Sequence, residues 1–102
     1  MVGFGYSDEG DVLEVFREGE KIDYNVELFE DYFIDFDSNG KIVGVEIINA
    51  SLALGVDKKE LKKIKNAELV TSNAKGGKKI AFVLKIGKSE ISSQIMLPAL
   101  SA

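Results

Sequence analysis

Acidic and amide side chains around one Asn-Gly pair form the most specific chemical pattern in the sequence. Asp35, Asp37, Asn39 and Glu46, with Gly40 at the sixth position, follow the spacing of the EF-hand calcium loop. In such a loop the first and last carboxylates converge on one ion. Here both flanks alternate as β-strands do, and a strand carries Glu46 about 20 Å away from Gly40 at roughly 3.3 Å per residue. We therefore predict a hairpin turn and assign no metal ligand to this weak match.

Two of these carboxylates stay close together if the segment is a hairpin. Asp35 and Glu46 then lie on the same face of neighbouring strands, in diagonal positions roughly 5–8 Å apart. Gly44 lies opposite Asp35 and leaves open space beside its carboxylate. Such a pair can perform acid–base chemistry or hold a divalent cation. Asp35, Gly44 and Glu46 are therefore the predicted binding residues, and the alternative is a solvated sheet face with lysines of the second half nearby.

The residue types that the sequence lacks limit its chemistry. It contains no cysteine and no histidine, which excludes thiolate nucleophiles and disulfides and removes the most common general base and transition-metal ligand. The Gly-Gly-Lys-Lys run at 76–79 lacks the spacing of a phosphate-binding loop. We expect no catalytic residue, no cofactor and no enzymatic activity.

Charge is distributed unevenly along the chain. Residues 1–50 carry thirteen acidic and three basic side chains, a net charge of −10, whereas residues 51–102 carry four acidic and ten basic ones, a net charge of +6. Either the halves complement each other within one fold, or the lysine-rich half meets an acidic partner. Lys58 to Lys65 is the candidate surface for nucleic acid, but it contains no arginine or aromatic residue, so we expect no nucleic-acid partner.

The N-terminal residues, Met1 to Asp11, contain neither a basic region nor an apolar run of the kind found in signal peptides. No stretch approaches the roughly 18 apolar residues of a membrane span. We therefore expect a cytoplasmic protein without a membrane partner.

Alternating apolar residues predict the strands that position the acidic pair. Asn39 and Gly40 favour a two-residue type I′ turn, which places Phe36 opposite Val43 and Ile34 opposite Val45. The carboxylates of the earlier acidic turn at 8–11 are expected to bond their own backbone.

A helix is predicted after this hairpin. Asp57 and Glu60 have the spacing of a capping box, and either Asn49 or Ser51 is expected to cap a first helical turn. Further on, Gly87-Lys88 suits a type II′ turn that places Leu84 opposite Ile91 and Lys85 opposite Glu90.

The elements together predict a mainly β (α+β) fold. An antiparallel β-meander (1–50) is followed by one short amphipathic helix packed on the sheet (51–66) and by a further three-strand meander (67–100). The length of 102 residues suits a single domain, 1–102.

A recognisable signature runs through the first half of the chain. It comprises Tyr6, Asp8, Asp11, Leu13 and Val15, then Asp35-Phe36-Asp37, Gly40, Ile42 to Ile47, and Asn49-Ala50-Ser51. Over about residues 6–52 the sequence resembles the small prokaryotic family known as domain of unknown function 2283, with a C-terminal β extension from Asp57 onward. Glu14 stands where members often have an aromatic residue.

The resemblance implies an antiparallel β-meander closed by a helix, and it implies no activity. Some members look like neighbours of toxin-like proteins, and the resemblance therefore also suggests an antitoxin-like binding role.

Two functions remain open from the sequence. The first is a non-enzymatic protein-interaction module, in which an edge strand such as Ala67 to Ser72 pairs with a protein partner or with a second copy in a homodimer. The alternative is a small-ligand or divalent-cation binding module that uses Asp35 and Glu46.

Overall fold

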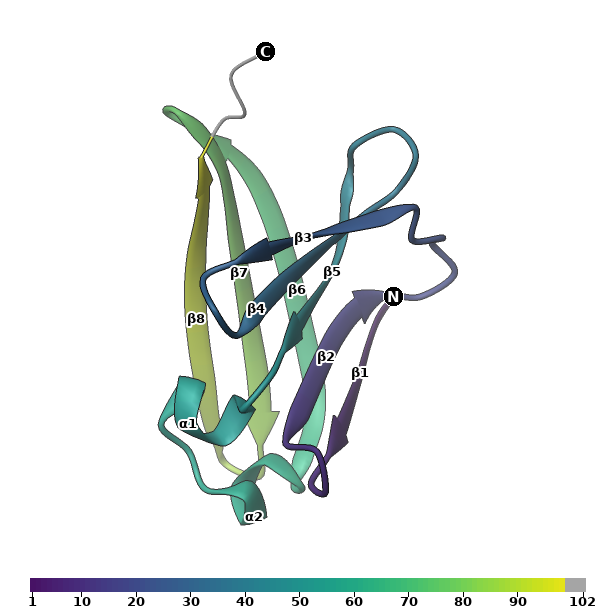
Figure 1. The fold of residues 1–102 in the computed structure, drawn as a ribbon. Coiled ribbons are helices and arrows are strands. Elements are labelled where there is room, and N and C mark those ends of the chain that lie inside the picture. The colour runs from purple at the N-terminus through teal and green to yellow at the C-terminus, as the bar shows by residue number, and fades with distance from the viewer. Residues whose placement is uncertain (99–102) are drawn as a thin grey trace.

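Two antiparallel sheets face each other across one core in the computed structural model, which describes residues 1–98 (Figure 1). The first sheet contains β1 (Val2–Ser7), β2 (Val12–Arg17), β3 (Tyr24–Leu28), β4 (Tyr32–Phe36) and β5 (Ile42–Ile47), in the spatial order β1-β2-β5-β4-β3. The second contains β6 (Ile64–Ala74), β7 (Gly77–Ile86) and β8 (Ser89–Pro98) in chain order. Helices α1 (Ala50–Leu54) and α2 (Lys58–Leu61) lie at one end of both sheets (Figure 1).

The predicted fold class is confirmed, because the described chain is mainly antiparallel β with short helical segments between the two groups of strands. Residues 99 and 100 of the expected C-terminal segment lie outside the described residues. No helix within residues 1–98 combines the length and the apolar character needed to cross a lipid bilayer.

The core forms because apolar residues alternate along every long strand and point to the space between the sheets. Leu13, Val45 and Ile47 of the first sheet and Phe82 and Leu84 of the second are almost completely buried in the same cluster. Ala50 of α1 and Leu61 of α2 close its end. The residues between these positions face outward, and on the first sheet they include acidic side chains, glycines and Phe16.

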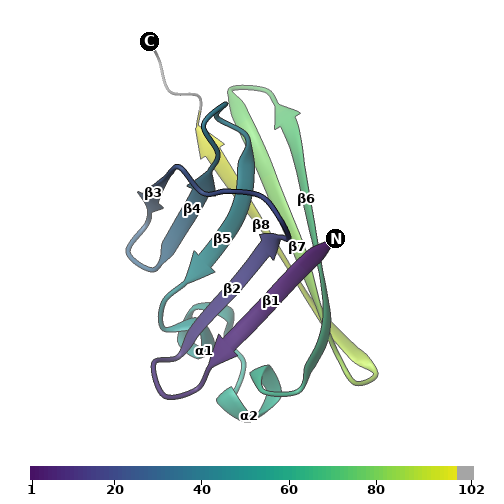
Figure 2. The same cartoon turned by 90° about the vertical axis from the view of Figure 1, so that its right-hand side faces the viewer.

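The first sheet depends on a pairing between strands that are distant in sequence. β5 lies between β2 and β4, so the N-terminal hairpin pairs with the strand that precedes α1. Leu13 is opposite Ile47, and Val15 is opposite Val45. Figure 2 shows β1, at the edge of this sheet, running beside β6 of the second sheet, and the two strands are in contact.

Asp11 ties the turn between β1 and β2 to the start of α1. Its Oδ1 accepts hydrogen bonds from the Tyr6 hydroxyl at 2.7 Å and from the Ser51 backbone N–H at 3.0 Å, and its Oδ2 accepts one from the Ser51 hydroxyl at 2.6 Å. Its backbone carbonyl accepts a hydrogen bond from the N–H of Ala50 at 2.9 Å. We call the contacts among Tyr6, Asp11, Ala50 and Ser51 the Asp11 clasp. They hold the turn between β1 and β2 against the first residues of α1, which follows β5.

Ionisation of Asp11 strengthens the clasp. Burial opposes the charge, but the hydrogen bonds from Ser51 and Tyr6 outweigh it and hold the pKa of Asp11 below its usual range. Burial and the contact with this carboxylate raise the pKa of Tyr6 to about 12. The expectation that the carboxylates of this turn bond their own backbone is therefore wrong for Asp11, whose carboxylate bonds Tyr6 and Ser51. Asn49 is the N-cap residue of α1, one of the two residues expected there, but its side chain makes no capping hydrogen bond.

The Asn-Gly turn reverses the chain as predicted, but it is not a type I′ turn. Among its residues only Gly40 has a positive φ, 80°. The Asp37 carboxylate accepts hydrogen bonds from the backbone N–H groups of Asn39 at 2.8 Å and Lys41 at 2.9 Å. These bonds stabilise a three-residue loop in place of the two-residue loop, since a type I turn followed by a left-handed glycine needs only one positive φ. The added loop residue pairs Phe36 with Ile42 instead of Val43, and a bulge between Phe36 and Asp35 restores the predicted pairing of Asp35 with Gly44.

The helical region is divided into two short helices instead of one. Gly55 ends α1 with a φ of 66°, and α2 ends before Ile64, which already pairs with Ile86 in the second sheet. Asp57 precedes α2 without a side-chain capping bond, so the predicted capping box with Glu60 does not form. The C-terminal hairpin, by contrast, has the predicted register, with Leu84 opposite Ile91.

We expect Asp11→Asn to lower the free energy of unfolding by about 2 kcal/mol, the order of a hydrogen bond to a charged group. Asp11 has a φ of 54°, in the left-handed region that asparagine also tolerates, so the loss reports on the contacts of the carboxylate. Urea denaturation at neutral pH measures it. Asp8→Asn is the matched control because Asp8 makes only an exposed ion pair, with Lys62 at 3.2 Å. Equal stability of the two variants would contradict the role of the clasp.

Candidate functional site

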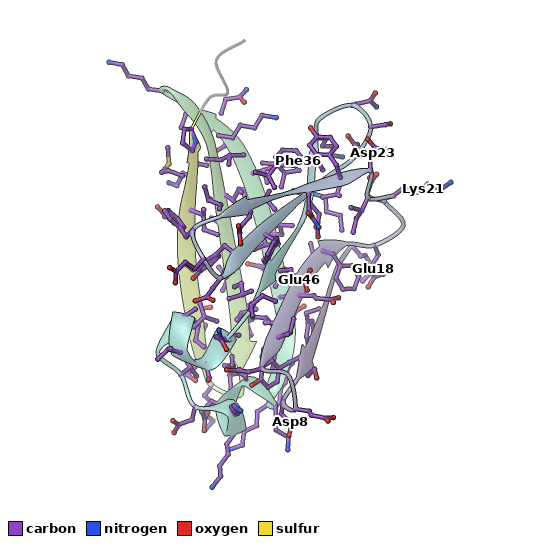
Figure 3. The ribbon with its side chains drawn as sticks, in the orientation of Figure 1. Asp8, Glu18, Lys21, Asp23, Phe36 and Glu46 are labelled. Carbon is purple, nitrogen blue, oxygen red and sulfur yellow. The ribbon has the colours of Figure 1, made fainter. Side chains whose placement is uncertain are left out.

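Three carboxylates meet on the outer face of the first sheet. The β4–β5 pairing places Asp35 opposite Gly44 and Phe33 opposite Glu46, as the sequence predicted. The β2–β5 pairing adds Glu14, which is directly opposite Glu46. Figure 3 labels Glu46 at the centre of this sheet, on β5 between β2 and β4. Directly paired residues have Cβ atoms about 5 Å apart, so Glu14 and Glu46 are immediate neighbours.

These side chains line a hollow of about 320 Å³ on the sheet surface, which we call the acidic hollow. Its charged side chains are Glu14, Arg17, Glu20, Asp35 and Glu46. The β2–β3 connection forms one wall, and its position is fixed by a 2.7 Å hydrogen bond from the N–H of Asp23 to the carbonyl of Phe36. The remaining residues that line it are Val15, Phe16, Ile22, Asn25, Val43 and Val45, of which Val15 and Val45 have their side chains in the core. Acidic groups therefore lie next to apolar surface.

Asp35 is the unusual member of this group. Only 8% of its surface is exposed, and no hydrogen bond or ion pair from residues 1–98 reaches its carboxylate. Burial raises the pKa of Asp35, and the charges of Glu46 and Glu14 raise it further. Its oxygens are not among the fully enclosed atoms that lack a partner, so the carboxylate opens onto the hollow, where a ligand can reach it.

Gly44 provides the space for the Asp35 side chain. A Cβ added to Gly44 would lie 2.9 Å from Oδ2 of Asp35 and 3.3 Å from the carbonyl oxygen of Val15. The carboxylate therefore lies directly over the glycine, in the space that the sequence predicted.

The cations at the hollow are fewer than its carboxylates: Arg17 and Lys41 lie there with four acidic side chains. The ion pairs within residues 1–98 join Lys41 to Glu20, Lys62 to Asp8 and Lys63 to Glu60, and only the first is at the rim of the hollow. Arg17 lines the hollow, but its Nε is buried without a hydrogen-bond partner. Within residues 1–98 no lysine of the second half forms an ion pair with the carboxylates of the hollow.

The described residues do not form a metal centre here. Within residues 1–98 no three side chains of the metal-binding types are placed to hold one ion. Of the residues that resemble a calcium loop, Asp37 bonds the backbone of its own turn, whereas Asp35 and Glu46 lie on the sheet face.

Residues 4–51 match the family model described as "Protein of unknown function (DUF2283)". This segment of the chain belongs to that family. The DUF2283 segment comprises the last part of β1, β2 to β5 and the start of α1, and so it contains both the Asp11 clasp and the acidic hollow. The resemblance stated from the sequence is confirmed.

An uncharacterized protein of Methanocaldococcus jannaschii is 47% identical to this chain over 62 residues, which cover 61% of the chain and 53% of that protein. The chain thus matches about half the length of this curated relative. No solved structure is similar to the chain at a significant level.

Glu14 is the residue that sequence reasoning missed. Its alternation with Leu13 and Val15 shows that it faces away from the core, but alternation cannot show which strand lies beside it. Only the β2–β5 pairing, between strands about thirty residues apart, places it opposite Glu46.

The other predicted surfaces are also located. Within Lys58 to Lys65, two lysines pair with acids, Lys62 with Asp8 and Lys63 with Glu60. The segment from Ala67 to Ser72 lies in β6, which is an edge strand of the second sheet as expected.

We expect Gly44→Ala to lower the free energy of unfolding by about 1–3 kcal/mol, because its methyl group overlaps Asp35 and meets the Val15 carbonyl. Gly5→Ala is the control on the same face of the sheet, since nothing lies within 4 Å of a Cβ at Gly5. Its effect should stay within about 0.5 kcal/mol. Chemical denaturation measures both, and similar losses would show that the space over Gly44 is not specific to Asp35.

Asp35→Asn should make the protein more stable at neutral pH. The pKa of Asp35 is raised in the folded state, so its contribution is full below the unfolded pKa, about 3.9, and is lost as pH rises through the folded value. The advantage of the variant should therefore grow with pH in denaturation series from about pH 3 to about pH 7. For Asp8, whose pKa is lowered by Lys62, Asp8→Asn should show the opposite trend. Parallel trends would contradict the burial of the Asp35 charge.

Proposed function

We propose that this protein is a binding module whose acidic hollow takes an organic cation, the ammonium or guanidinium end of a ligand. The observation that carries the proposal is the carboxylate of Asp35, which is buried next to two other acidic side chains and has no partner within the described residues. A bound cation with N–H donors would provide both the missing charge and the missing hydrogen bonds.

The arrangement is costly for the protein alone. Like charges directly opposite each other destabilise a sheet, and Glu14 and Glu46 are such a pair. Burying Asp35 beside them adds a desolvation cost, which its raised pKa reflects. Side chains that destabilise a fold are typical of functional sites, because the ligand offsets the cost that the free protein carries.

The walls of the hollow favour an organic cation over a metal ion. Phe16 and Ile22 provide apolar surface for an alkyl or planar group beside the charge. The carboxylates are spread over β2, β4 and β5, and within residues 1–98 no three side chains of metal-binding types converge on one point. The volume of about 320 Å³ is at the lower end of the range for small-ligand sites.

The lining residues favour binding over catalysis. A carboxylate with a raised pKa beside an acidic neighbour can act as a general acid. However, the side chains that line the hollow include no serine, threonine, tyrosine or lysine that could act as a nucleophile. The proposal therefore keeps the expectation of a non-enzymatic module.

The cation can belong to a small molecule or to a lysine or arginine side chain of a protein partner. Both sources present the same chemistry to the hollow, and the second corresponds to the protein-interaction module that the sequence suggested. The antitoxin-like role suggested by the resemblance would be one form of that interaction and stays a prediction.

Titration followed by amide chemical shifts of isotope-labelled protein at low ionic strength tests the proposal. Agmatine, putrescine and a short arginine-containing peptide are the probes, with calcium chloride as the metal arm. We expect saturable shifts centred on Glu14, Asp35 and Gly44 with the organic cations, weakened by salt. Tighter binding of the peptide than of agmatine assigns the cation to a protein partner, and the reverse assigns it to a small molecule.

The double variant Asp35→Asn with Glu46→Gln should weaken binding at least about tenfold, equivalent to about 1.4 kcal/mol. Glu27→Gln is the matched control, because Glu27 is exposed on the same sheet but does not line the hollow. The proposal fails if no organic probe causes saturable shifts there, if the double variant binds as well as the control, or if calcium alone binds.

A further inference from the structure

The second sheet has a long strand that is paired on one side only. β8 is at one edge of the order β6-β7-β8. The other edge strand, β6, is in contact with β1 and β2 of the first sheet, as Figure 2 shows for β1. Outside the regular ladders, the backbone hydrogen bonds of the described residues all lie before residue 64, so none of them reaches the free side of β8.

β8 lacks the features that protect an edge strand from pairing except near its two ends, where Glu90 and Pro98 lie. Natural edges are usually short, bulged, or marked by charged side chains. β8 is ten residues long, pairs with β7 without a register shift, and has no ionisable side chain between Ile91 and Leu97. The edge strand β3 of the first sheet, by comparison, has five residues and includes Glu27.

We propose that β8 pairs antiparallel with β8 of a second copy of this chain and joins the two three-stranded sheets into one of six strands. When a strand pairs antiparallel with the same strand of a second copy, the two copies are related by a two-fold axis. The partner strand is then β8 itself, and its direction is antiparallel. This proposal is independent of the acidic hollow, which lies on the other sheet.

The β8 sequence is compatible with itself in this arrangement. Centred on Gln94, the pairing puts Ile91 opposite the partner's Leu97 and Ser93 opposite the partner's Ile95 on the core-facing side. On the outer side Ser92 is opposite the partner's Met96. Inner residues thus face inner residues, as one continuous sheet requires.

Charge also favours this register. Glu90, the only ionised residue of β8, is opposite the partner's Pro98. The two copies of Glu90 are then about 27 Å apart at roughly 3.4 Å per residue, so they do not repel each other strongly. Pro98 has no N–H to donate and is found at edges or strand ends, which suits the end of the pairing.

Light scattering coupled to size-exclusion chromatography, from micromolar to millimolar concentration, tests the proposal on the full chain. We expect a mass approaching twice 11.1 kDa as concentration rises. Ser92→Lys with Met96→Lys places lysines opposite each other across the two-fold axis and should weaken the dimer at least about tenfold. Added salt should restore part of the loss, because it screens these charges.

Val70→Lys is the matched control. Val70 is 60% exposed on the outer side of β6, away from the β8 edge, and the variant should dimerise as the unmodified chain does. Amide spectra of each variant verify that it is folded. A wild-type chain that stays monomeric at millimolar concentration overturns the proposal. So does a folded double lysine variant that dimerises as strongly as the control.

Discussion

The pairing of β2 with β5 is the constraint on which the rest of the first sheet depends. Without it, the β1–β2 hairpin and the β3–β4–β5 meander would be two small sheets, each with a further exposed edge. With it, Leu13 and Val15 join Val45 and Ile47 in one buried layer. The Asp11 clasp secures the end of this pairing, because it bonds the turn before β2 to the helix that follows β5. The DUF2283 signature residues Tyr6, Asp11 and Ser51 therefore have a structural role.

The same pairing creates the acidic hollow, and glycines determine its shape. In one row across the outer face, Gly3 is opposite Phe16, Phe16 is opposite Gly44, and Gly44 is opposite Asp35. A Cβ at Gly3 would lie 2.6 Å from the Phe16 ring, so this ring covers Gly3 just as the Asp35 carboxylate covers Gly44. Small and large residues alternate across four strands, and this alternation allows a carboxylate to be buried on the outside of a sheet.

Local patterns predicted the local parts of this structure. Alternation and turn residues were sufficient for the C-terminal hairpin and for the placement of Asp35 opposite Gly44, because a hairpin register depends on residues close in sequence. The turn type was wrong because the Asp37 carboxylate, and not the intrinsic preference of Asn39, decided the loop. The insertion of β5 beside β2 was beyond local patterns, and Glu14 was missed for the same reason. Strand order in a sheet is a property of the whole chain, and a single sequence contains little local information about it.

The uneven charge of the sequence becomes a polarity of the folded molecule. The acidic half forms the first sheet and the lysine-rich half forms the second, with the apolar core between them. The ion pairs of the described residues include one between these halves, Lys62 with Asp8, so complementation within the fold is limited to the helical end of the molecule. The outer face of the first sheet thus keeps a negative field that attracts cations. On the lysine-rich sheet, β8 carries no lysine between Ile91 and Leu97. Self-pairing is therefore least opposed by charge at that edge.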